Sequence, residues 1–417
     1  MRMHSIASLL FLTVAAGAVP GTTQAQQPTV PDRAGVADAL RFLRETEAET
    51  LADQVALCEI PAPPFGETAR SEAYRERFAA HGLNDVRIDG EGNVLGEVGG
   101  GDPVVVLSAH LDTVFPAGTD VSVRREGSLL IGPGIGDDCR GLAVVLAVAR
   151  AMRHFELEPT GTIVFVGTVG EEGPGDLRGV KRLFAETLAG RVDYFISVDG
   201  AGRTLTHAAV GSNRYEVTFR GPGGHSYGAF GMPNPIHALG RAIAKLSDFE
   251  VPADPKTTFN VGLVEGGTSV NSIAFETMMT VDLRSESADS LSVLDEAFRA
   301  AIDEALAEEN ARWDSDVGLT VDVVSVGVRP AGAQPLSAPI IQAALATAEE
   351  LGFAARASAS STDSNIPLSL EVPAVTIDGG GRGRGAHSLD ESFDTTDSHI
   401  GTQWAFLLAL TLAGLGG

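Results

Sequence analysis

The stretch that decides the fold is Val104-Val105-Val106-Leu107-Ser108-Ala109-His110-Leu111-Asp112-Thr113-Val114. Its first four residues are apolar without alternation, which is typical of a central parallel strand covered on both faces. Open α/β sheets bind ligands at the carboxyl ends of such strands, where His110 and Asp112 lie. An imidazole there can ligate a metal through one nitrogen while a carboxylate accepts the other N–H. The alternative is a histidine and an aspartate paired in an ordinary loop.

The same arrangement recurs along the chain, because acids and a late histidine follow other apolar strands or occupy a glycine-rich turn. These residues are Asp137, Asp138, Glu171, Glu172, Asp199 and His387. A solvated surface would scatter acids without regard to strand ends. The joint pattern therefore indicates one site built from hard or borderline metal ligands.

The composition limits the class of protein. The chain has 417 residues, of which 44% are hydrophobic and 20% are charged, so it is long enough for more than one globular domain. Thirty Lys and Arg residues against 55 Asp and Glu residues give a formal net charge of −25. This charge argues against nucleic acid or an anionic membrane as a partner.

The first 25 residues predict a removed signal peptide. Arg2 precedes the apolar stretch 6–19, and Thr23-Gln24-Ala25 resembles a small-residue cleavage site. The apolar stretch is short for a membrane span, and retention as an uncleaved anchor is the alternative. We expect an exported protein, periplasmic or extracellular, with no membrane association after cleavage.

Cys58 and Cys139 are the only cysteines. Two cysteines are too few for a disulfide framework in a chain of this length. The sequence predicts separate, partly buried thiols, with pairing after export as the alternative.

Alternating strand and helix patterns predict an α/β fold with a doubly wound, mostly parallel sheet. Helical periodicity covers 34–58 and 67–80, before the apolar strand at 104–107. From residue 212 the order changes to strand-helix-strand-strand-helix-strand, a split βαβ or ferredoxin-like pattern. We therefore expect a discontinuous catalytic domain, 26–211 and 330–417, with a smaller α+β module inserted at 212–329.

The motifs, taken together, resemble the zinc-dependent family that contains peptidase T, glutamate carboxypeptidase, aminoacylase and succinyl-diaminopimelate desuccinylase. They are closest to the peptidase T-like branch, and the resemblance covers nearly all of the mature chain. It implies two Zn²⁺ ions per subunit, with Co²⁺ or Mn²⁺ as substitutes. In the implied ligand set Asp137 bridges the metals, His110 and Asp199 bind one, and Glu172 and His387 bind the other.

The resemblance also implies roles for residues that are not ligands. Asp112 orients His110, and Glu171 is the general base. His225, in Gly221-Pro222-Gly223-Gly224-His225-Ser226, stabilises an oxyanion across a homodimer formed by the inserted lid or dimerisation module. Arg284 and Asn271 bind the substrate carboxylate and carbonyl. The alternatives are a sheet salt bridge for Arg284 and a polar turn residue for His225.

One departure from the usual family pattern, and one position that differs between branches of the family, bear on function. Cys139 stands where the family often has the lysine of Asp-x-Lys, without changing the implied ligands. Asp199 is more frequent in peptidase and dipeptidase branches, whereas deacylases more often have Glu.

We therefore expect an exopeptidase acting on small peptides, with hydrolysis of N-acyl amino acids as the alternative. A non-catalytic zinc- or peptide-binding protein is a third hypothesis. Glu171 argues against it, because binding alone needs no general base. The side-chain preference and the native metal stay open.

Overall fold

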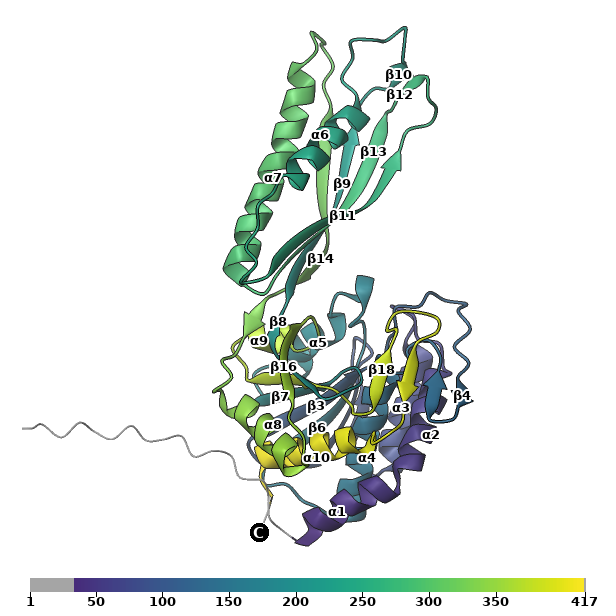
Figure 1. The fold of residues 1–417 in the computed structure, drawn as a ribbon, viewed down its shortest axis with the longest axis vertical. Helices are drawn as coiled ribbons and strands as arrows, with labels where there is room; N and C mark the ends of the chain where they lie inside the picture. Colours follow the sequence, from purple (N-terminus) through teal and green to yellow (C-terminus); the bar gives the residue numbers. More distant parts are fainter. Residues whose placement is uncertain (1–33, 416–417) are drawn as a thin grey trace, which may run out of the picture.

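The structure is a computed structural model, and it describes residues 34–415. Figure 1 shows an elongated molecule in which a small module stands on a larger α/β domain. The predicted signal peptide, residues 1–25, lies outside the described residues. Between residues 34 and 415, no helix has the length and apolar character needed to cross a membrane.

The large domain is built on a nine-stranded mixed sheet. Its strands are β1 (Asn84–Ile88), β2 (Val94–Gly99), β3 (Val104–His110), β6 (Thr162–Thr168), β7 (Tyr194–Val198), β8 (Thr204–Ala209), β15 (Gly332–Ala333), β16 (Arg356–Ser360) and β17 (Ala374–Ile377). The order is β1-β2-β6-β3-β7-β17-β8-β15, with β16 also paired to β8. The central strands β6, β3, β7 and β17 are parallel, and antiparallel strands flank them. The predicted α/β class is confirmed.

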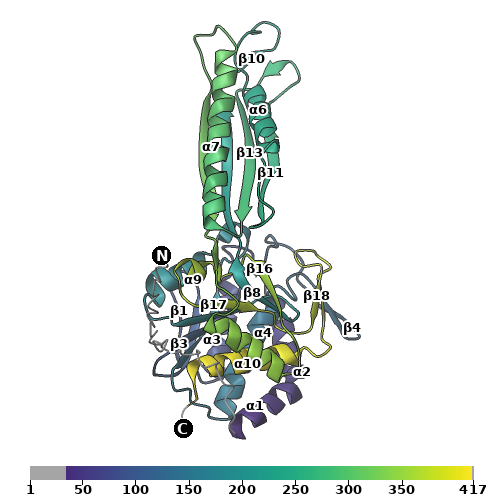
Figure 2. The same cartoon turned by 60° about the vertical axis from the view of Figure 1, so that its left-hand side comes forward.

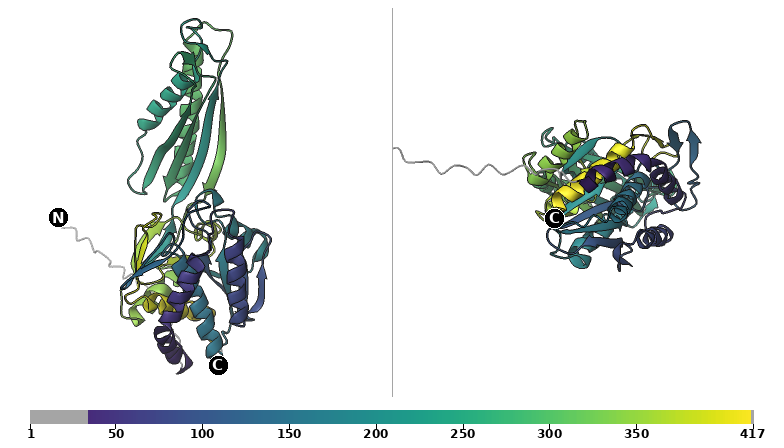
Figure 3. Two further views of the ribbon diagram at one scale, coloured as in Figure 1. Left: turned by 90° about the vertical axis from the view of Figure 1, so that its right-hand side faces the viewer. Right: turned by 90° about the horizontal axis from the view of Figure 1, so that it is seen from below.

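Helices cover both faces of this sheet. They are α1 (Ala34–Glu45), α2 (Glu47–Cys58), α3 (Thr68–Ala80), α4 (Cys139–His154), α5 (Arg178–Arg182), α8 (Pro339–Glu350), α9 (Asn365–Ser369) and α10 (His399–Ala413). Alternate side chains of β3 enter different apolar clusters: Val105 and Leu107 pack with α4 and α10, and Val106 packs on the opposite face. This two-sided burial explains why the strand has no polar alternation. Figure 3 shows α1 beside α10 from below.

The predicted helical stretch 34–58 is two helices rather than one. The chain turns at Thr46, whose hydroxyl donates to the carbonyl of Phe42 at 2.8 Å. Threonine can satisfy a backbone carbonyl locally in this way, which competes with a continuous helix.

The small module is a four-stranded antiparallel sheet with two helices on one face. Its elements are β9 (Gly211–Arg220), α6 (Pro235–Ser247), β11 (Thr257–Gly266), β13 (Glu276–Ser285), α7 (Ala288–Ala311) and β14 (Thr320–Arg329), in the sheet order β11-β13-β9-β14. Asn234 and Ser287 cap the two helices through their side chains. A short pairing of β10 (Gly224–His225) with β12 (Ser272–Ile273) forms the end remote from the large domain, as Figure 2 also shows.

A third, small sheet was not predicted. It contains β4 (Arg124–Glu126), β5 (Leu129–Ile131), β18 (Arg382–Arg384) and β19 (Ser392–Asp394), in the order β18-β19-β5-β4. Strands of three residues are too short to show a reliable period of two. This sheet holds the loop between β18 and β19 beside the turn that follows β5.

The prediction of separate, partly buried cysteines was wrong. Cys58 and Cys139 form a disulfide with a Cα–Cα distance of 5.4 Å, and both side chains are fully buried. Cys58 ends α2 and Cys139 begins α4, so the bond ties α2 to the turn that carries Asp137. Sequence alone could not establish this proximity, because 81 residues separate the two positions.

Candidate active site

Neighbouring parallel strands bring chemistry-bearing residues to one edge of the large sheet. His110 is the last residue of β3, and Asp199 directly follows β7. Glu171 and Glu172 follow β6, which pairs with β3. The carboxyl ends of adjacent parallel strands meet at one edge, so these residues converge although they are distant in sequence.

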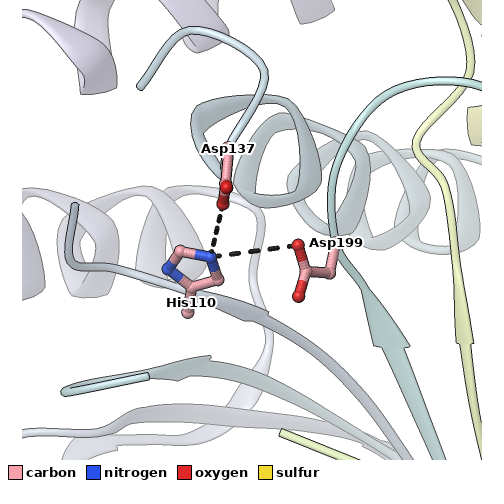
Figure 4. Close-up of side chains that lie close together, drawn as sticks. All are labelled: His110, Asp137 and Asp199. Atoms are coloured by element: carbon pink, nitrogen blue, oxygen red, sulfur yellow. Dashed lines mark hydrogen bonds and ion pairs between the residues drawn. The ribbon is translucent and has the colours of Figure 1, made fainter. Parts of the chain in front are cut away.

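Asp137 is shared by two groups of possible metal ligands. Its Oδ1 lies 2.9 Å from His110 Nε2, and its Oδ2 lies 3.2 Å from His387 Nε2. Asp199 completes the first group, with Oδ1 4.0 Å from His110 Nε2 (Figure 4). Glu172 completes the second group, with Oε1 3.1 Å from His387 Nε2. All five residues implied as ligands therefore lie together, in the implied grouping.

The electrostatics of these groups suit divalent cations. Burial raises the pKa of Asp199 well above its usual value, and the nearby charge of Asp137 raises it further. Hydrogen bonds with Asp137 and Glu172 raise the pKa of His387 to about 10. A cation in each group would relieve the repulsion between the carboxylates. Carboxylate oxygen and imidazole nitrogen are ligands that zinc accepts.

Asp112 supports the site by a different route from the implied one. His110 Nδ1 lies 3.0 Å from the backbone carbonyl of Asp112, and 3.6 Å from its carboxylate. A carbonyl only accepts, so Nδ1 donates and Nε2 keeps its lone pair for the side of Asp137. The Asp112 carboxylate instead accepts the backbone N–H groups of Glu171 and Glu172, at 2.9 and 2.8 Å. It therefore orients the Glu171-Glu172 turn as well as the imidazole.

Glu171 is buried beside both ligand groups and is paired with an arginine that sequence reasoning missed. Burial raises the pKa of Glu171 to about 8, against the opposing charge of Arg329. Arg329 Nη1 donates to Glu171 Oε1 at 3.0 Å and to Ser361 Oγ at 3.0 Å. Arg329 is the last residue of β14, in the inserted module. An arginine at a strand end carries no distinctive sequence signal.

Glu391 is a second residue that sequence reasoning missed. Its buried carboxylate accepts the backbone N–H groups of Gly134, Gly136 and Asp137, at 3.1, 2.7 and 3.0 Å. It lies four residues after His387 in the loop between β18 and β19. Its hydrogen bonds therefore connect the loop that carries His387 to the turn that carries Asp137. His387 itself has a φ of 67°, an uncommon backbone conformation that often occurs at functional sites.

A cavity of about 760 Å³ opens beside the two groups. Asp137, Glu171 and Asp199 line it, together with hydroxyl side chains and arginines from both parts of the molecule. Arg284 lines it as expected for a substrate-binding residue, and its Nε also donates to Asp282 at 2.7 Å. The substrate and salt-bridge interpretations of Arg284 are thus compatible.

His225 and Asn271 do not line this cavity within one chain. His225 belongs to β10 at the remote end of the small module, and Asn271 precedes β12 there. The two segments touch through a hydrogen bond from the Ser226 N–H to the Asn271 carbonyl, at 2.9 Å. Both side chains are exposed. The two predicted residues are therefore neighbours of each other, but not of the metal ligands of their own chain.

Comparisons with known proteins identify the family of this chain. Residues 106–411 match the profile of Peptidase family M20/M25/M40. A succinyl-diaminopimelate desuccinylase of Pseudomonas syringae is 28% identical over 261 residues, 57% of this chain and 67% of that protein. The uncharacterized protein YqjE of Bacillus subtilis is 25% identical over 292 residues, 65% of this chain and 75% of that protein.

A solved tripeptidase structure from Staphylococcus aureus has the same fold. Its TM-score is 0.74 at 22% identity, and the match covers 88% of this chain and 98% of the tripeptidase. The family resemblance in the sequence is thus confirmed by a profile that spans most of the chain. This chain belongs to peptidase family M20/M25/M40 and is a hydrolase that acts on peptide or amide bonds.

Proposed function

We propose that this protein is an exported, co-catalytic di-zinc exopeptidase that cleaves small peptides. The observation that carries the proposal is the shared Asp137 carboxylate, with one oxygen toward His110 and the other toward His387. A carboxylate in that position can hold two cations close together. Export is supported by the leader-like residues 1–25 and by the Cys58–Cys139 disulfide, a bond common in oxidising compartments.

The residues present fit two metals. His110, Asp199 and Asp137 would hold one ion, and Glu172, His387 and Asp137 the other. Zinc in such a site acts as a Lewis acid and lowers the pKa of water, as in other zinc hydrolases.

Glu171 has the geometry of the general base. Its carboxylate is buried next to both ligand groups and lines the cavity. In the ionised state it takes the proton of the attacking water and later gives it to the leaving amine. Burial raises the pKa of Glu171, and the charge of Arg329 opposes this rise, so Arg329 favours the ionised base.

A direct test combines metal analysis with a substrate screen. We expect the purified protein to bind two zinc ions per chain and to hydrolyse di- or tripeptides in a metal-dependent way. His387→Ala should lose tight binding of at least one ion by elemental analysis, whereas His237→Ala, at an exposed histidine of α6, should bind as wild type. Two tightly bound ions in His387→Ala would overturn the ligand set.

The second candidate function is hydrolysis of N-acyl amino acids. It is favoured by the match to a desuccinylase and by the arginines of the cavity, which suit acidic substrates. N-acyl amino acids in the same screen separate the two candidates. Faster turnover of the N-acyl compounds than of all peptides tested would favour the second function.

We also propose that the protein acts as a homodimer in which His225 serves the partner's site. The exposed position of His225, remote from its own cavity, supports this assembly. A donor aimed at a developing oxyanion contributes about 10²–10³-fold in rate. Mixing inactive Glu171→Gln with inactive His225→Ala should restore activity, because subunit exchange creates one site with both residues.

Light scattering and subunit exchange make this test decisive. The control mixture contains Glu171→Gln and His237→Ala in place of His225→Ala. The His237→Ala variant should be fully active by itself. No recovered activity despite demonstrated exchange, or an active monomer, would overturn the trans role of His225.

A further inference from the structure

Four arginines line the same cavity as the metal-site carboxylates. Arg214, Arg284 and Arg329 come from β9, β13 and β14 of the small module, and Arg356 begins β16 of the large sheet. Glu171 engages one of them, Arg329. Arg214 also donates to the backbone carbonyl of Gly173 at 3.2 Å, beside Glu172. Within residues 34–415, no hydrogen bond joins Arg284 or Arg356 to the implied metal ligands or to Glu171, so these two arginines call for a separate physical reason.

The three module arginines lie close enough to repel one another. Burial lowers the pKa of Arg214, and the charges of Arg329 and Arg284 lower it further. Asp282 is the acid shared by two of them, with Oδ2 2.7 Å from Arg284 Nε and Oδ1 3.5 Å from Arg214 Nε. One carboxylate between two guanidinium groups leaves a positive charge on this wall of the cavity.

Arg356 supplies a second, separate positive charge. Within residues 34–415 its side chain makes no hydrogen bond or ion pair. Its charge acts on Asp378, whose carboxylate already accepts the Thr204 N–H at 2.7 Å and whose pKa burial raises to about 6. Ser358 and Ser360 lie beside Arg356 on the same strand and line the cavity. This wall offers a cation and hydroxyl donors.

The charges of the whole lining favour an anionic ligand. Four arginines face five carboxylates, which are Asp137, Glu171, Glu172, Asp199 and Asp378. With Asp282 counted as well, the four arginines and six carboxylates give a balance of −2, and two divalent cations in the proposed metal site would turn it into +2. Arg356 is exposed and Arg284 is partly exposed, so a neutral or singly charged substrate would leave them to solvent, whereas a second carboxylate would gain a charged hydrogen-bonded contact.

We infer that the substrate is an amide with two separate carboxylates, one bound by Arg214 and Arg284 and the other by Arg356. This inference rests on the proposed function and narrows its substrate class. A guanidinium group binds a carboxylate through two parallel N–H donors, and each such charged contact is strong when water is partly excluded. Acidic dipeptides and amino acids with a dicarboxylic acyl group both have this chemistry.

Matched substrates isolate the second carboxylate. Asp-Ala against Asn-Ala tests a peptide source, and N-succinyl-alanine against N-butyryl-alanine tests an acyl source. With the zinc-loaded full protein, we expect kcat/KM to be about 10–100-fold higher for the doubly charged member of at least one pair, the range for a charged hydrogen-bonded contact. Arg356→Gln should remove most of this ratio, and Arg125→Gln, at an exposed arginine outside the cavity, should keep it.

Binding gives a readout that does not depend on turnover. Isothermal titration of Glu171→Gln with the same four compounds should show the same preference, and the double variant with Arg356→Gln should lose it. Equal binding within both pairs, or an Arg356→Gln effect no larger than that of Arg125→Gln, would overturn the inference. Absence of hydrolysis of all peptides and N-acyl compounds would instead refute the proposed function, and the titrations would still decide the charge preference.

Discussion

Family motifs occur in two regions, at the carboxyl ends of the strands of the large sheet and at the remote end of the small module. The two regions differ in whether one chain brings the partners of the motif residues together. At the edge, His110 and Asp112 are buried and bonded to their partners within one chain. At the remote end, His225 and Asn271 are exposed, and the two segments that carry them pair with each other. A sequence motif thus shows that a residue of a given type is present at a given position. The topology of the chain decides whether that residue lies near the other residues of the site.

The largest effect should come from the edge. Glu171→Gln removes the proton acceptor but keeps the size of the side chain, so kcat should fall about 10²–10⁴-fold. Metal content by elemental analysis should stay at the wild-type value. Glu158→Gln, at an exposed glutamate, is the control and should be fully active. A variant with near wild-type kcat would remove Glu171 from the mechanism.

The pairing of Arg329 with Glu171, at the junction of the small module and the large domain, should control the pH dependence of kcat/KM. Burial raises the pKa of Glu171 to about 8, and Arg329 lowers it, so Arg329→Gln should raise it further. The base works when ionised, and the acidic limb of kcat/KM should therefore move to higher pH, by about 1–3 units. Bound cations lower the pKa in both proteins, so the difference between the two profiles is the measurement.

Arg329→Lys serves as the control for this shift, because it keeps the positive charge. Its acidic limb should stay near that of wild type. Movement of the limb to lower pH in Arg329→Gln would contradict the assigned pairing.

A smaller effect is expected from the support of the shared ligand. Glu391→Gln weakens the acceptor for three N–H groups in the Asp137 turn, and zinc affinity should fall about 10–100-fold, as for other residues that orient ligands. Competition with a chelator measures this change. Asp390→Asn, at the exposed neighbouring residue, should bind zinc normally. Unchanged affinity in Glu391→Gln would show that the turn holds Asp137 without it.

The smallest effect should be seen at the remote end. Asn271→Ala removes an exposed side chain whose hydrogen bond, with Ser269 Oγ, is local, so the free energy of unfolding should change by less than about 0.5 kcal/mol. Urea denaturation tests this. A loss of more than 1 kcal/mol would mean that the pairing of β10 with β12 is structurally important in the single chain.

Sequence patterns predicted the parts of the fold that depend on local periodicity. The apolar run before His110 became β3, and the helical stretch expected at 67–80 became α3. Patterns of this kind survive because burial on one or two faces dictates the residue types. The small sheet of β4, β5, β18 and β19 and the break at Thr46 were not predicted, because neither changes the hydrophobic period over enough residues.

The candidate site divides in the same way. The grouping of the five residues of the implied ligand set was predictable, since each follows or flanks a recognisable element and belongs to a family motif. Arg329, Glu391 and the Cys58–Cys139 bond were not, because their roles arise only when distant segments meet. Asp112 was recognised, but its carboxylate holds the Glu171-Glu172 turn more directly than it holds the imidazole.

Arg329 lies at the end of β14, where the small module joins the large domain. The junction therefore holds the two parts together and also brings a charged group to Glu171. Next to Arg329, the backbone carbonyl of Val328 accepts from Lys181 Nζ at 2.9 Å, and the Val328 N–H donates to Asp176 Oδ1 at 3.0 Å. The ten-residue strands of the module span about 33 Å, so a small rotation at the junction would displace the far end of the module by a much larger distance. When Glu171 takes a proton it loses the charge that attracts Arg329. The hydrogen bond from Arg329 Nη2 to the backbone carbonyl of Glu171 does not depend on that charge, so protonation would weaken the link between Arg329 and Glu171 without removing it.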